Sequence, residues 1–338
     1  MKTFIGKNLL EKINQLFDFT KFSKIGILTD ENIPKSLVNQ AEKSLNRKLI
    51  KIIIPAGEKE KNIETVKKIW EIMFQNGFDR RSLLINLGGG VVCDMGGFAA
   101  ATFMRGIDFL NIPTTLLAQV DASVGGKTGI DFLEIKNGIG IFNNPIGVVI
   151  DVDTLKTLPK RELTAAYGEI IKHGVISGQQ YFDLVTSKKP GEFSQKELIK
   201  IIKQSIKIKS NIVKKDPKEK YLRKVLNFGH TIGHAIESLS WKTDRPLLHG
   251  EAVAIGMVVE ARLFGTTSKT IKKTIINAGL PTRITNIKTE DIMKSILSDK
   301  KNFRGEILFS LPKKIGKVIV NVEVPKELLI KAIKSVII

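Results

Sequence analysis

The sequence predicts an α/β N-terminal domain built on a mostly parallel sheet, followed by a mainly α-helical second domain. The first half alternates short apolar runs with segments whose apolar residues recur every three or four positions, as strands and helices do. Such alternation implies a parallel sheet with both faces covered. From about Pro159 one helical pattern follows another, and 338 residues suffice for two domains. We place these domains at residues 1–155 and 156–338.

The first domain should contain short buried strands separated by amphipathic helices. Its apolar runs are rich in Ile, Leu and Val, and the segments between them have helical periodicity. Because ligands on parallel sheets gather at the carboxyl ends of strands, the loops that follow these strands are candidate binding segments. We expect strands over residues 25–29, 49–54, 82–87 and 148–151, and helices over 34–45 and 62–76.

The second domain should consist almost entirely of helices. The helical periodicity resumes after each loop, and only two late segments have the pattern of strands. A hinge between the domains is expected around residues 151–159. The expected helices span residues 160–176, 195–214, 223–240, 249–265, 268–278 and 289–298, and the expected strands span 306–311 and 317–322.

The net charge of +20 and the pI near 9.8 raise the question of nucleic-acid binding, because clustered Lys and Arg neutralise phosphates. Only ten of the 54 basic residues are Arg, however, and the lysines are spread along the chain. Three Tyr and two Trp also offer little for base stacking. We therefore expect no nucleic-acid partner, and interpret the lysines as a solvated surface with some recruitment of anionic ligands.

The chain also lacks the sequence signals of membrane insertion and secretion. No apolar run approaches the roughly 18 residues of a membrane span, and charged residues interrupt the N-terminus where a signal peptide would be apolar. The single cysteine, Cys93, excludes an internal disulfide and a Cys-rich zinc module. We expect a cytoplasmic protein without a membrane partner, in which any zinc site uses His and carboxylate.

Three of the four histidines fall within twenty residues and suggest a metal site. His230 and His234 lie four apart on a predicted helix, so both could reach one ion from the same face. Spacing alone leaves open that they are surface or hydrogen-bonded core histidines. His249 opens an almost wholly apolar helix, where an unpartnered imidazole would be costly to bury. A buried metal ligand would explain this third histidine.

A glycine-rich turn at residues 87–98 follows the strand at 82–87 and leads into an apolar helix. Glycines there let a phosphate approach the backbone, and the start of the helix offers N–H donors, so a dinucleotide pyrophosphate would fit. The spacing is not the usual Gly-x-Gly-x-x-Gly and follows the third strand, so an ordinary strand-to-helix turn remains the alternative. Cys93 should pack beside the turn as a small apolar residue.

A second glycine cluster at residues 121–128 contains Gly-Lys-Thr and so resembles a nucleotide-binding P-loop. Asp121 occupies the position of the required first glycine, where a carboxylate would repel phosphate, and we therefore reject an ATPase. Lys127 together with Lys136 and Asn137 still forms a candidate anion pocket.

Charged residues also occur where apolar ones are expected. Lys209 falls on the inward face of the predicted helix 195–214, where it would pair with an acid, extend to solvent or hold a substrate carboxylate. Glu169, Lys172 and His173 interrupt a helix that is otherwise small and apolar. A salt bridge between Glu169 and Lys172 or His173 is the simplest interpretation of this second cluster.

Taken together, these segments resemble the 3-dehydroquinate synthase family of the shikimate pathway over nearly the whole chain. Coincidences of short motifs do not yield so long an ordered set. The resemblance rests on GEKEK at 57–61, GGGVVCD at 88–94, FMRG at 103–106, PTTLLAQVD at 113–121, GGKTG at 125–129, KN at 136–137, EIIK at 169–172, LNFGH at 226–230 and HGEA at 249–252.

The resemblance implies an NAD- and metal-dependent lyase of chorismate and aromatic amino acid biosynthesis. Its reaction converts 3-deoxy-D-arabino-heptulosonate 7-phosphate to 3-dehydroquinate and phosphate by transient oxidation, elimination, reduction, ring opening and internal aldol closure. NAD then belongs to the first domain, and metal and substrate to the second. By similarity Glu169, His230 and His249 hold the metal, zinc or alternatively cobalt, while His234 transfers protons.

The resemblance also implies roles for the remaining residues. Arg105 is similar to a residue that reaches a neighbouring subunit's site, so a homodimer is expected. The implied catalytic residues are His234, Glu219, Lys172 and Asp121, and the implied substrate-binding residues are Arg105, Lys127, Asn137, Lys209, Arg223, Asn227 and one of Lys300 and Lys301. The implied NAD-binding residues are Asp30, Asn32, Gly57, Glu58, Lys59, Glu60, Lys61, Gly89, Gly90, Val91, Val92, Cys93, Asp94, Thr114, Thr115, Lys127, Lys136, Thr154, Leu155, Lys156 and Thr157.

Two related activities remain alternatives at this point. Another sugar-phosphate cyclase could use the same scaffold, zinc and NAD to make a different carbocycle. A polyol dehydrogenase of the same fold would not need so many phosphate and carboxylate partners. Asn227, Lys209, Arg223 and the pair Lys300 and Lys301 favour the dehydroquinate reaction.

Overall fold

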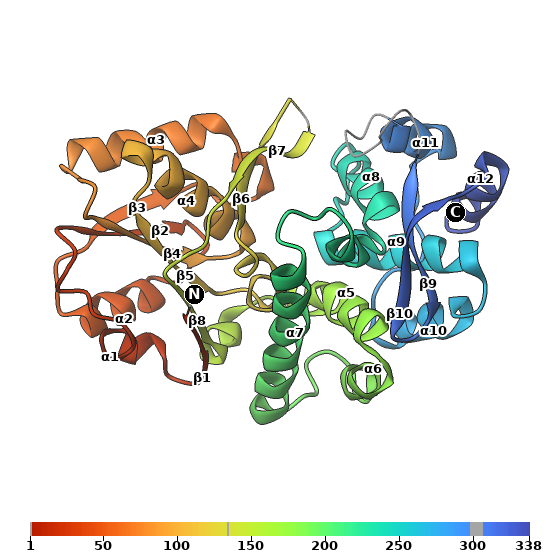
Figure 1. The fold of residues 1–338 in the computed structure, drawn as a ribbon, viewed down its shortest axis with the longest axis horizontal. Coiled ribbons are helices and arrows are strands. Elements are labelled where there is room, and N and C mark those ends of the chain that lie inside the picture. Colours follow the sequence, from red (N-terminus) through yellow and green to blue (C-terminus); the bar gives the residue numbers. More distant parts are fainter. Residues whose placement is uncertain (1, 134, 298–306) are drawn as a thin grey trace. The chain divides into compact units, whose positions relative to one another are not determined.

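The computed structural model describes residues 2–133, 135–297 and 307–338 (Figure 1). The chain divides into two compact units, Met1–Pro159 and Lys160–Ile338. None of the described helices is both long and apolar enough to cross a membrane.

The first unit is built on a six-stranded sheet in which every neighbouring pair is parallel. Parallel strands buried on both faces need nearly continuous apolar runs, which explains the Ile- and Leu-rich segments of the sequence. Across the sheet the order is β1 (Lys2–Gly6), β8 (Gly147–Asp151), β5 (Asp108–Pro113), β4 (Leu83–Gly88), β2 (Ile25–Asp30) and β3 (Ile50–Ile54).

Helices cover the two faces of this sheet and bury a separate apolar core on each (Figure 1). One core packs α1 (Ile13–Leu16) and α2 (Lys35–Leu45) against the strands, and the other packs α3 (Ile63–Gln75) and α4 (Gly90–Thr102). Alternate residues of a strand serve opposite cores: Ile27 belongs to the first and Leu28 to the second. Short turns η1 (Leu10–Lys12), η2 (Glu58–Glu60), η3 (Phe103–Arg105), η4 (Ala118–Ala122) and η5 (Val152–Thr157) complete the connections.

A β-hairpin of β6 (Lys127–Phe132) and β7 (Ile135–Phe142) forms a small antiparallel sheet of its own in the first unit. The strand β6 begins at Lys127, within the Gly-Lys-Thr sequence, whereas a P-loop would continue into a helix. The local structure therefore supports the rejection of an ATPase motif.

The second unit is mainly helical and is organised around α9 (His249–Phe264). Residues 250–261 of this helix are all buried, since α5 (Lys160–Ser177), α8 (His230–Ser240) and other elements pack on it. The remaining elements are α6 (Gln179–Thr186), α7 (Gln195–Lys215), η6 (Leu222–Asn227), α10 (Ser268–Asn277), α11 (Thr289–Leu297), α12 (Lys326–Lys334) and an antiparallel pair, β9 (Leu308–Lys314) with β10 (Lys317–Glu323).

The predicted fold class is confirmed, and most predicted elements are present within a few residues of their expected ends. The single helix predicted over 223–240 is wrong. Gly229 has a left-handed backbone (φ 81°), which separates the 3₁₀ turn η6 from α8. The prediction omitted β1, β5, the hairpin, α6 and α12. Residues 298 and 306, at the ends of two predicted elements, lie outside the described residues, as do Lys300 and Lys301.

Candidate active site

Glu169, His230 and His249 meet in the second unit, although they come from three helices, α5, α8 and α9. The Oε1 atom of Glu169 lies 3.3 Å from Nε2 of His230 and 3.5 Å from Nε2 of His249. Tetrahedral zinc bonds of about 2.0–2.2 Å place neighbouring ligand atoms about 3.3–3.5 Å apart. The three side chains therefore fit a metal ion and leave its fourth position for a substrate oxygen.

His234 lies beside this group, with its ring centroid 5.0 Å from that of His230 and 5.8 Å from that of His249. A second possible ligand group, His234 with Glu237 and His249, overlaps the first. Nδ1 of His249 lies 3.1 Å from Oε2 of Glu237, while Nε2 faces Glu169. A histidine that binds metal through one nitrogen commonly donates the other N–H to a carboxylate, which favours the group with Glu169.

Glycines beside each candidate ligand allow the three helices to approach closely. A Cβ atom added at Gly250 would lie 1.8 Å from the carbonyl oxygen of Ala165, and one at Gly168 would lie 2.2 Å from the carbonyl oxygen of Gly250. At Gly229 it would lie 2.6 Å from Cγ of Met257. These distances are below van der Waals contact, so the backbone contacts require glycine. Glu169, His230 and His249 each adjoin one of these glycines.

Carboxylates set the electrostatics of the cluster. Burial alone would lower the pKa of His249, but Glu237 and Glu169 outweigh it and raise that pKa to about 10. Lys172 is buried and forms an ion pair with Glu169, one turn away on α5. The predicted salt bridge is therefore present beside the metal-ligand geometry. Burial also raises the pKa of Glu260 to about 8, although backbone N–H groups of α8 and the charge of Lys172 favour its ionised form.

Other predicted substrate and proton-transfer residues cluster around η6 and the loop before it. Asn227 donates from Nδ2 to Oε1 of Glu219 (2.7 Å), and Glu219 has a left-handed backbone (φ 58°). Arg223 is buried and donates to the carbonyl of Pro217 (2.8 Å). Lys209 is buried on α7, as the helical periodicity predicted. Strained backbone often accompanies functional groups, which is consistent with a role for this loop.

In the first unit, the predicted NAD-binding residues other than Lys127 and Lys136 of the hairpin gather at the carboxyl ends of the sheet's strands. They occupy the ends of parallel strands or the segments that follow them, and parallel strands end on the same side. Between β2 and β4 the strand order reverses, which is where such sheets usually bind ligands. Asp30 and Asn32 come from β2 and its loop, Gly57 to Lys61 follow β3, Gly89 to Asp94 follow β4, Thr114 and Thr115 follow β5, and Thr154 to Thr157 follow β8.

The glycine-rich turn forms the N-terminus of α4. Gly89 is the N-cap residue and has no side chain to satisfy the first N–H groups of the helix. A Cβ atom at Gly90 would lie 3.2 Å from that of Ala122, so even a small side chain would narrow the turn. Cys93 is buried, which raises the pKa of its thiol. These features suit an anion held by backbone donors, with Cys93 as a packing residue.

Lys61 links three of the predicted binding segments. Its buried Nζ donates to Oδ2 of Asp94 (2.5 Å) and to Oδ1 of Asn137 (2.7 Å). Burial opposes its charge, but Asp94 and Glu58 raise the pKa of Lys61. Asn137 has a left-handed backbone (φ 50°) and donates its N–H to Asp131 (2.7 Å). Lys61 thus holds the GEKEK segment against α4 and the hairpin.

Asp131 was not predicted from the sequence, and neither were Glu237 and Glu260 in the second unit. Glu237 and Glu260 are acids in largely apolar helices, and Asp131 lies between Ile130 and Phe132 in β6. The same signal singled out Lys209 and could have identified them.

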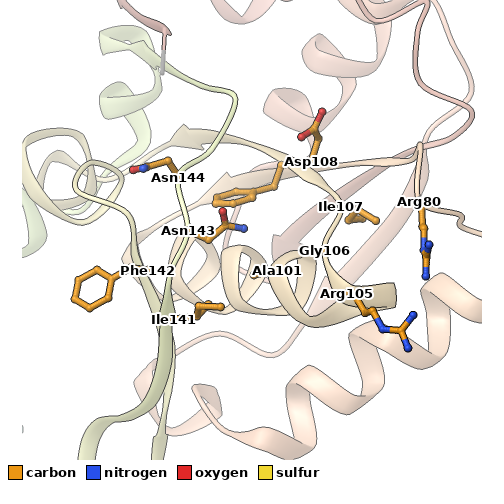
Figure 2. Close-up of a pocket in the computed structure, with 11 residues that line it drawn as sticks. Arg80, Ala101, Arg105, Gly106, Ile107, Asp108, Ile141, Phe142, Asn143 and Asn144 are labelled. Carbon is orange, nitrogen blue, oxygen red and sulfur yellow. The ribbon is translucent and has the colours of Figure 1, made fainter. Parts of the chain in front are cut away.

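Arg105 lies elsewhere in the first unit, in a shallow hollow of about 440 Å³. Figure 2 shows Arg105 and Arg80 together with Ile141 and Phe142 of the hairpin. Arg105 has a left-handed backbone (φ 71°). Of the other predicted residues, Lys127 begins β6 and Asp121 lies in η4. The Nζ atom of Lys136 lies 3.5 Å from Oε1 of Glu58.

Comparison with known proteins gives consistent matches along the chain. Family models described as 3-dehydroquinate synthase N-terminal and 3-dehydroquinate synthase C-terminal match residues 51–165 and 166–302. A 3-dehydroquinate synthase of Alkaliphilus metalliredigens (strain QYMF) is 42% identical over 335 residues, covering 96% of this chain and 93% of that protein.

Solved structures are similar in fold. A 2-deoxy-scyllo-inosose synthase complexed with carbaglucose-6-phosphate, NAD+ and Co2+ has a TM-score of 0.90 and 24% identity, covering 98% of this chain and 96% of that one. A 2-epi-5-epi-valiolone synthase of Streptomyces hygroscopicus subsp. jinggangensis 5008 with NAD+ and Zn2+ bound has a TM-score of 0.86 and 24% identity, with coverage of 99% and 96%.

Proposed function

Because this chain belongs to the 3-dehydroquinate synthase family and is an enzyme of that type, we propose that it binds its catalytic metal through Glu169, His230 and His249. The observation that carries the proposal is the separation of 3.3 and 3.5 Å between Oε1 of Glu169 and the two Nε2 atoms. Histidine nitrogen with one carboxylate is a usual donor set for catalytic zinc, and cobalt is the alternative.

We propose that NAD binds along the carboxyl edge of the parallel sheet in the first unit. The glycine turn before α4 and the reversal of strand order between β2 and β4 support this position. Thr114 and Thr115, at the end of β5, border the same edge. The bound NAD would supply a hydride acceptor that is regenerated in each turnover.

The residues around η6 and α8 can then bind the substrate and move its protons. In the reaction, an alcohol is oxidised transiently, phosphate is eliminated beside the new ketone, and reduction, ring opening and aldol closure follow. A bound zinc ion would supply a Lewis acid for the substrate oxygen. Lys172, Lys209 and Arg223 would hold the substrate anions and stabilise charge as phosphate leaves. His234 and Glu219 would handle protons.

The test is phosphate release from 3-deoxy-D-arabino-heptulosonate 7-phosphate by purified protein with NAD+ and zinc. We expect release with formation of dehydroquinate, and its loss after chelation or in the variant His249→Ala. Glu162→Gln, on the same helix as Glu169, is the control and should retain activity. Zinc and NAD+ binding without phosphate release would contradict the proposed substrate and point to another sugar-phosphate cyclase. Net accumulation of NADH would indicate a polyol dehydrogenase.

We also propose a cytoplasmic homodimer, in which the outer surface of the hairpin contacts a second copy of the chain. Ile139, Ile141 and Phe142 on β7 are exposed, and β7 pairs only with β6 among the described residues. An exposed apolar edge strand is a natural site of association. Arg105 borders the same surface, in agreement with its implied role at a neighbouring subunit (Figure 2).

Sedimentation analysis of Phe142→Lys tests the dimer. We expect this variant to be monomeric at concentrations where the wild type is dimeric. Ile53→Lys is the matched control, because Ile53 on the edge strand β3 is 59% exposed and Phe142 is 57% exposed. A dimer that persists in Phe142→Lys, or one that dissociates equally in both variants, would contradict the assignment. Cell fractionation with an antibody to the native chain would test the cytoplasmic location.

A further inference from the structure

The helices α8 and α9 each carry a buried carboxylate that contacts the start of the other helix. On α9, fully buried Glu260 accepts hydrogen bonds from the N–H of Gly229 (2.6 Å) and the N–H of Ile232 (3.2 Å). On α8, buried Glu237 accepts from Nδ1 of His249, the first residue of α9 (3.1 Å). Each acid thus contacts the N-terminus of the other helix. His230 begins α8 and His249 begins α9, so both N-termini carry a candidate metal ligand.

The contact of Glu260 replaces an ordinary helix cap. The N-cap residue of α8 is Gly229, which has no side chain to accept from the first N–H groups, and its left-handed backbone (φ 81°) disfavours the usual capping residues. The two side-chain oxygens of Glu260 accept from the N–H groups of Gly229 and Ile232 in place of a capping side chain. Glu260 therefore fixes the turn from which His230 projects.

The close approach of the two helices makes this contact possible. A Cβ atom at Gly256 would lie 2.0 Å from the carbonyl oxygen of Gly229, and one at Gly233 would lie 3.1 Å from Cα of Val253. Backbone contact along this seam leaves little freedom for either helix to slide. The side chain of Glu260, one turn beyond Gly256, is thereby held at the first turn of α8.

The contact of Glu237 determines the orientation of an imidazole ring. A carboxylate at Nδ1 retains the proton on that nitrogen and leaves Nε2 directed toward Glu169, 3.5 Å away. Rotation of the ring by 180° would exchange each nitrogen with a ring carbon, so that Nε2 would no longer face Glu169.

We propose that Glu237 and Glu260 are reciprocal positioning residues of the metal site. Glu260 on α9 orients His230 through the first turn of α8, and Glu237 on α8 orients His249 directly. The inference rests on the proposed metal ligands Glu169, His230 and His249. Neither acid is a ligand in this arrangement, since each acts through a histidine or its helix.

The experiment measures zinc affinity by competition with a chromophoric chelator, together with the visible spectrum of the cobalt-loaded protein. The variants are Glu237→Gln, Glu237→Ala and Glu260→Gln. We expect zinc affinity to fall by about 10- to 100-fold, as is typical when partners of metal ligands are removed, with an altered cobalt spectrum. Glu237→Gln can still accept from His249 and should lose less affinity than Glu237→Ala. In Glu260→Gln the side-chain NH2 group would face the N–H of Gly229 or of Ile232. Two donors cannot form a hydrogen bond, so one of the two contacts would be lost.

Ile236→Val is the control for simple destabilisation, because it removes a buried methylene from α8 without touching a candidate ligand. It should bind zinc like the wild type. If Glu260→Gln fails to fold, Glu260→Asp is used instead, because it keeps the carboxyl group but withdraws it by one methylene from the N–H groups of Gly229 and Ile232. Zinc affinities equal to wild type in the folded variants, or an equal loss in Ile236→Val, would overturn the proposal. A wild-type protein that binds no zinc would instead refute the proposed function.

Discussion

The two units form their candidate sites in different ways. In the first unit, the proposed NAD site consists of backbone and short loops that follow adjacent parallel strands, with Gly89 and Gly90 at its centre. In the second, Glu169, His230 and His249 are far apart in sequence and meet because glycines let three helices touch. The first site depends on local turn structure, whereas the second depends on helix packing. The two sites should therefore respond differently to substitution.

The largest effect is expected where a glycine brings two helices together. In Gly250→Ala, the new Cβ atom would start 1.8 Å from the carbonyl oxygen of Ala165, so the backbones of α5 and α9 must separate. We expect a loss of about 3 kcal/mol or more in the free energy of unfolding, together with loss of zinc binding. Thermal or denaturant unfolding measures the first effect. The control Gly6→Ala meets only ordinary contacts at 3.6 Å and should be nearly neutral; equal stability of both variants would refute the packing argument.

Removal of a metal ligand should abolish zinc binding in the second unit but leave NAD+ binding in the first unit nearly unchanged. We expect His230→Ala to lose zinc binding and phosphate release, by at least about 100-fold, while NAD+ affinity changes little because its proposed site lies in the other unit. Isothermal titration with zinc and with NAD+ checks both parts. An equal loss of NAD+ affinity would contradict the separation of the sites.

The reciprocal experiment alters the glycine turn of the first unit. In Gly90→Val the side chain would extend from a position only 3.2 Å from Cβ of Ala122 and would obstruct the N-terminus of α4. We expect NAD+ affinity to fall by at least about tenfold, with zinc affinity retained. Unchanged NAD+ binding would show that the turn is an ordinary strand-to-helix connection.

Loss of the Lys61 side-chain contacts should have a smaller effect on stability. Lys61→Met keeps the apolar stem but removes the hydrogen bonds to Asp94 and Asn137. Because Asp94 retains some contact with solvent, we expect a loss of about 1–3 kcal/mol in unfolding free energy. NAD+ affinity should also fall, since the GEKEK segment loses its anchor. A variant as stable as wild type would contradict the anchoring role.

The smallest effect is expected at Cys93. Its thiol is buried and its pKa is raised by burial, so little reactive thiolate should form in the native protein. Alkylation by iodoacetamide should be slow in the native state and fast after unfolding, and Cys93→Ala should retain activity. Rapid inactivation of the native enzyme by iodoacetamide would contradict this packing role.

Sequence periodicity alone predicted the strands and helices whose apolar residues form a continuous run or recur every three or four positions. The strands β2, β3, β4 and β8 and most helices of the second unit were predicted in this way. The pattern failed at residues 223–240, because both halves have helical periodicity and only the left-handed backbone of Gly229 separates them. It also missed β7, whose exposed apolar residues and glycines do not alternate with polar ones.

The candidate site could be predicted only in part from residue patterns. The pair His230 and His234 drew attention to α8, but spacing alone joins these two histidines, whereas the proposed ligand group is Glu169, His230 and His249. Glu169 lies 61 residues before His230, and no local pattern indicates that helix packing brings them together. Family resemblance supplied that set. Glu237 and Glu260 stand out in the sequence as acids in apolar helices, but their contacts with His249 and with the first turn of α8 are seen only in the folded protein.

The most direct test of the account is the zinc content of purified wild type, Glu169→Gln and Glu162→Gln after identical loading and desalting. Both glutamates lie on α5, so the two variants differ mainly in whether the changed carboxylate faces the histidines. We predict about one zinc per chain in the wild type and in Glu162→Gln, and a value near zero in Glu169→Gln. Retention of about one zinc per chain by Glu169→Gln would contradict the proposed metal site.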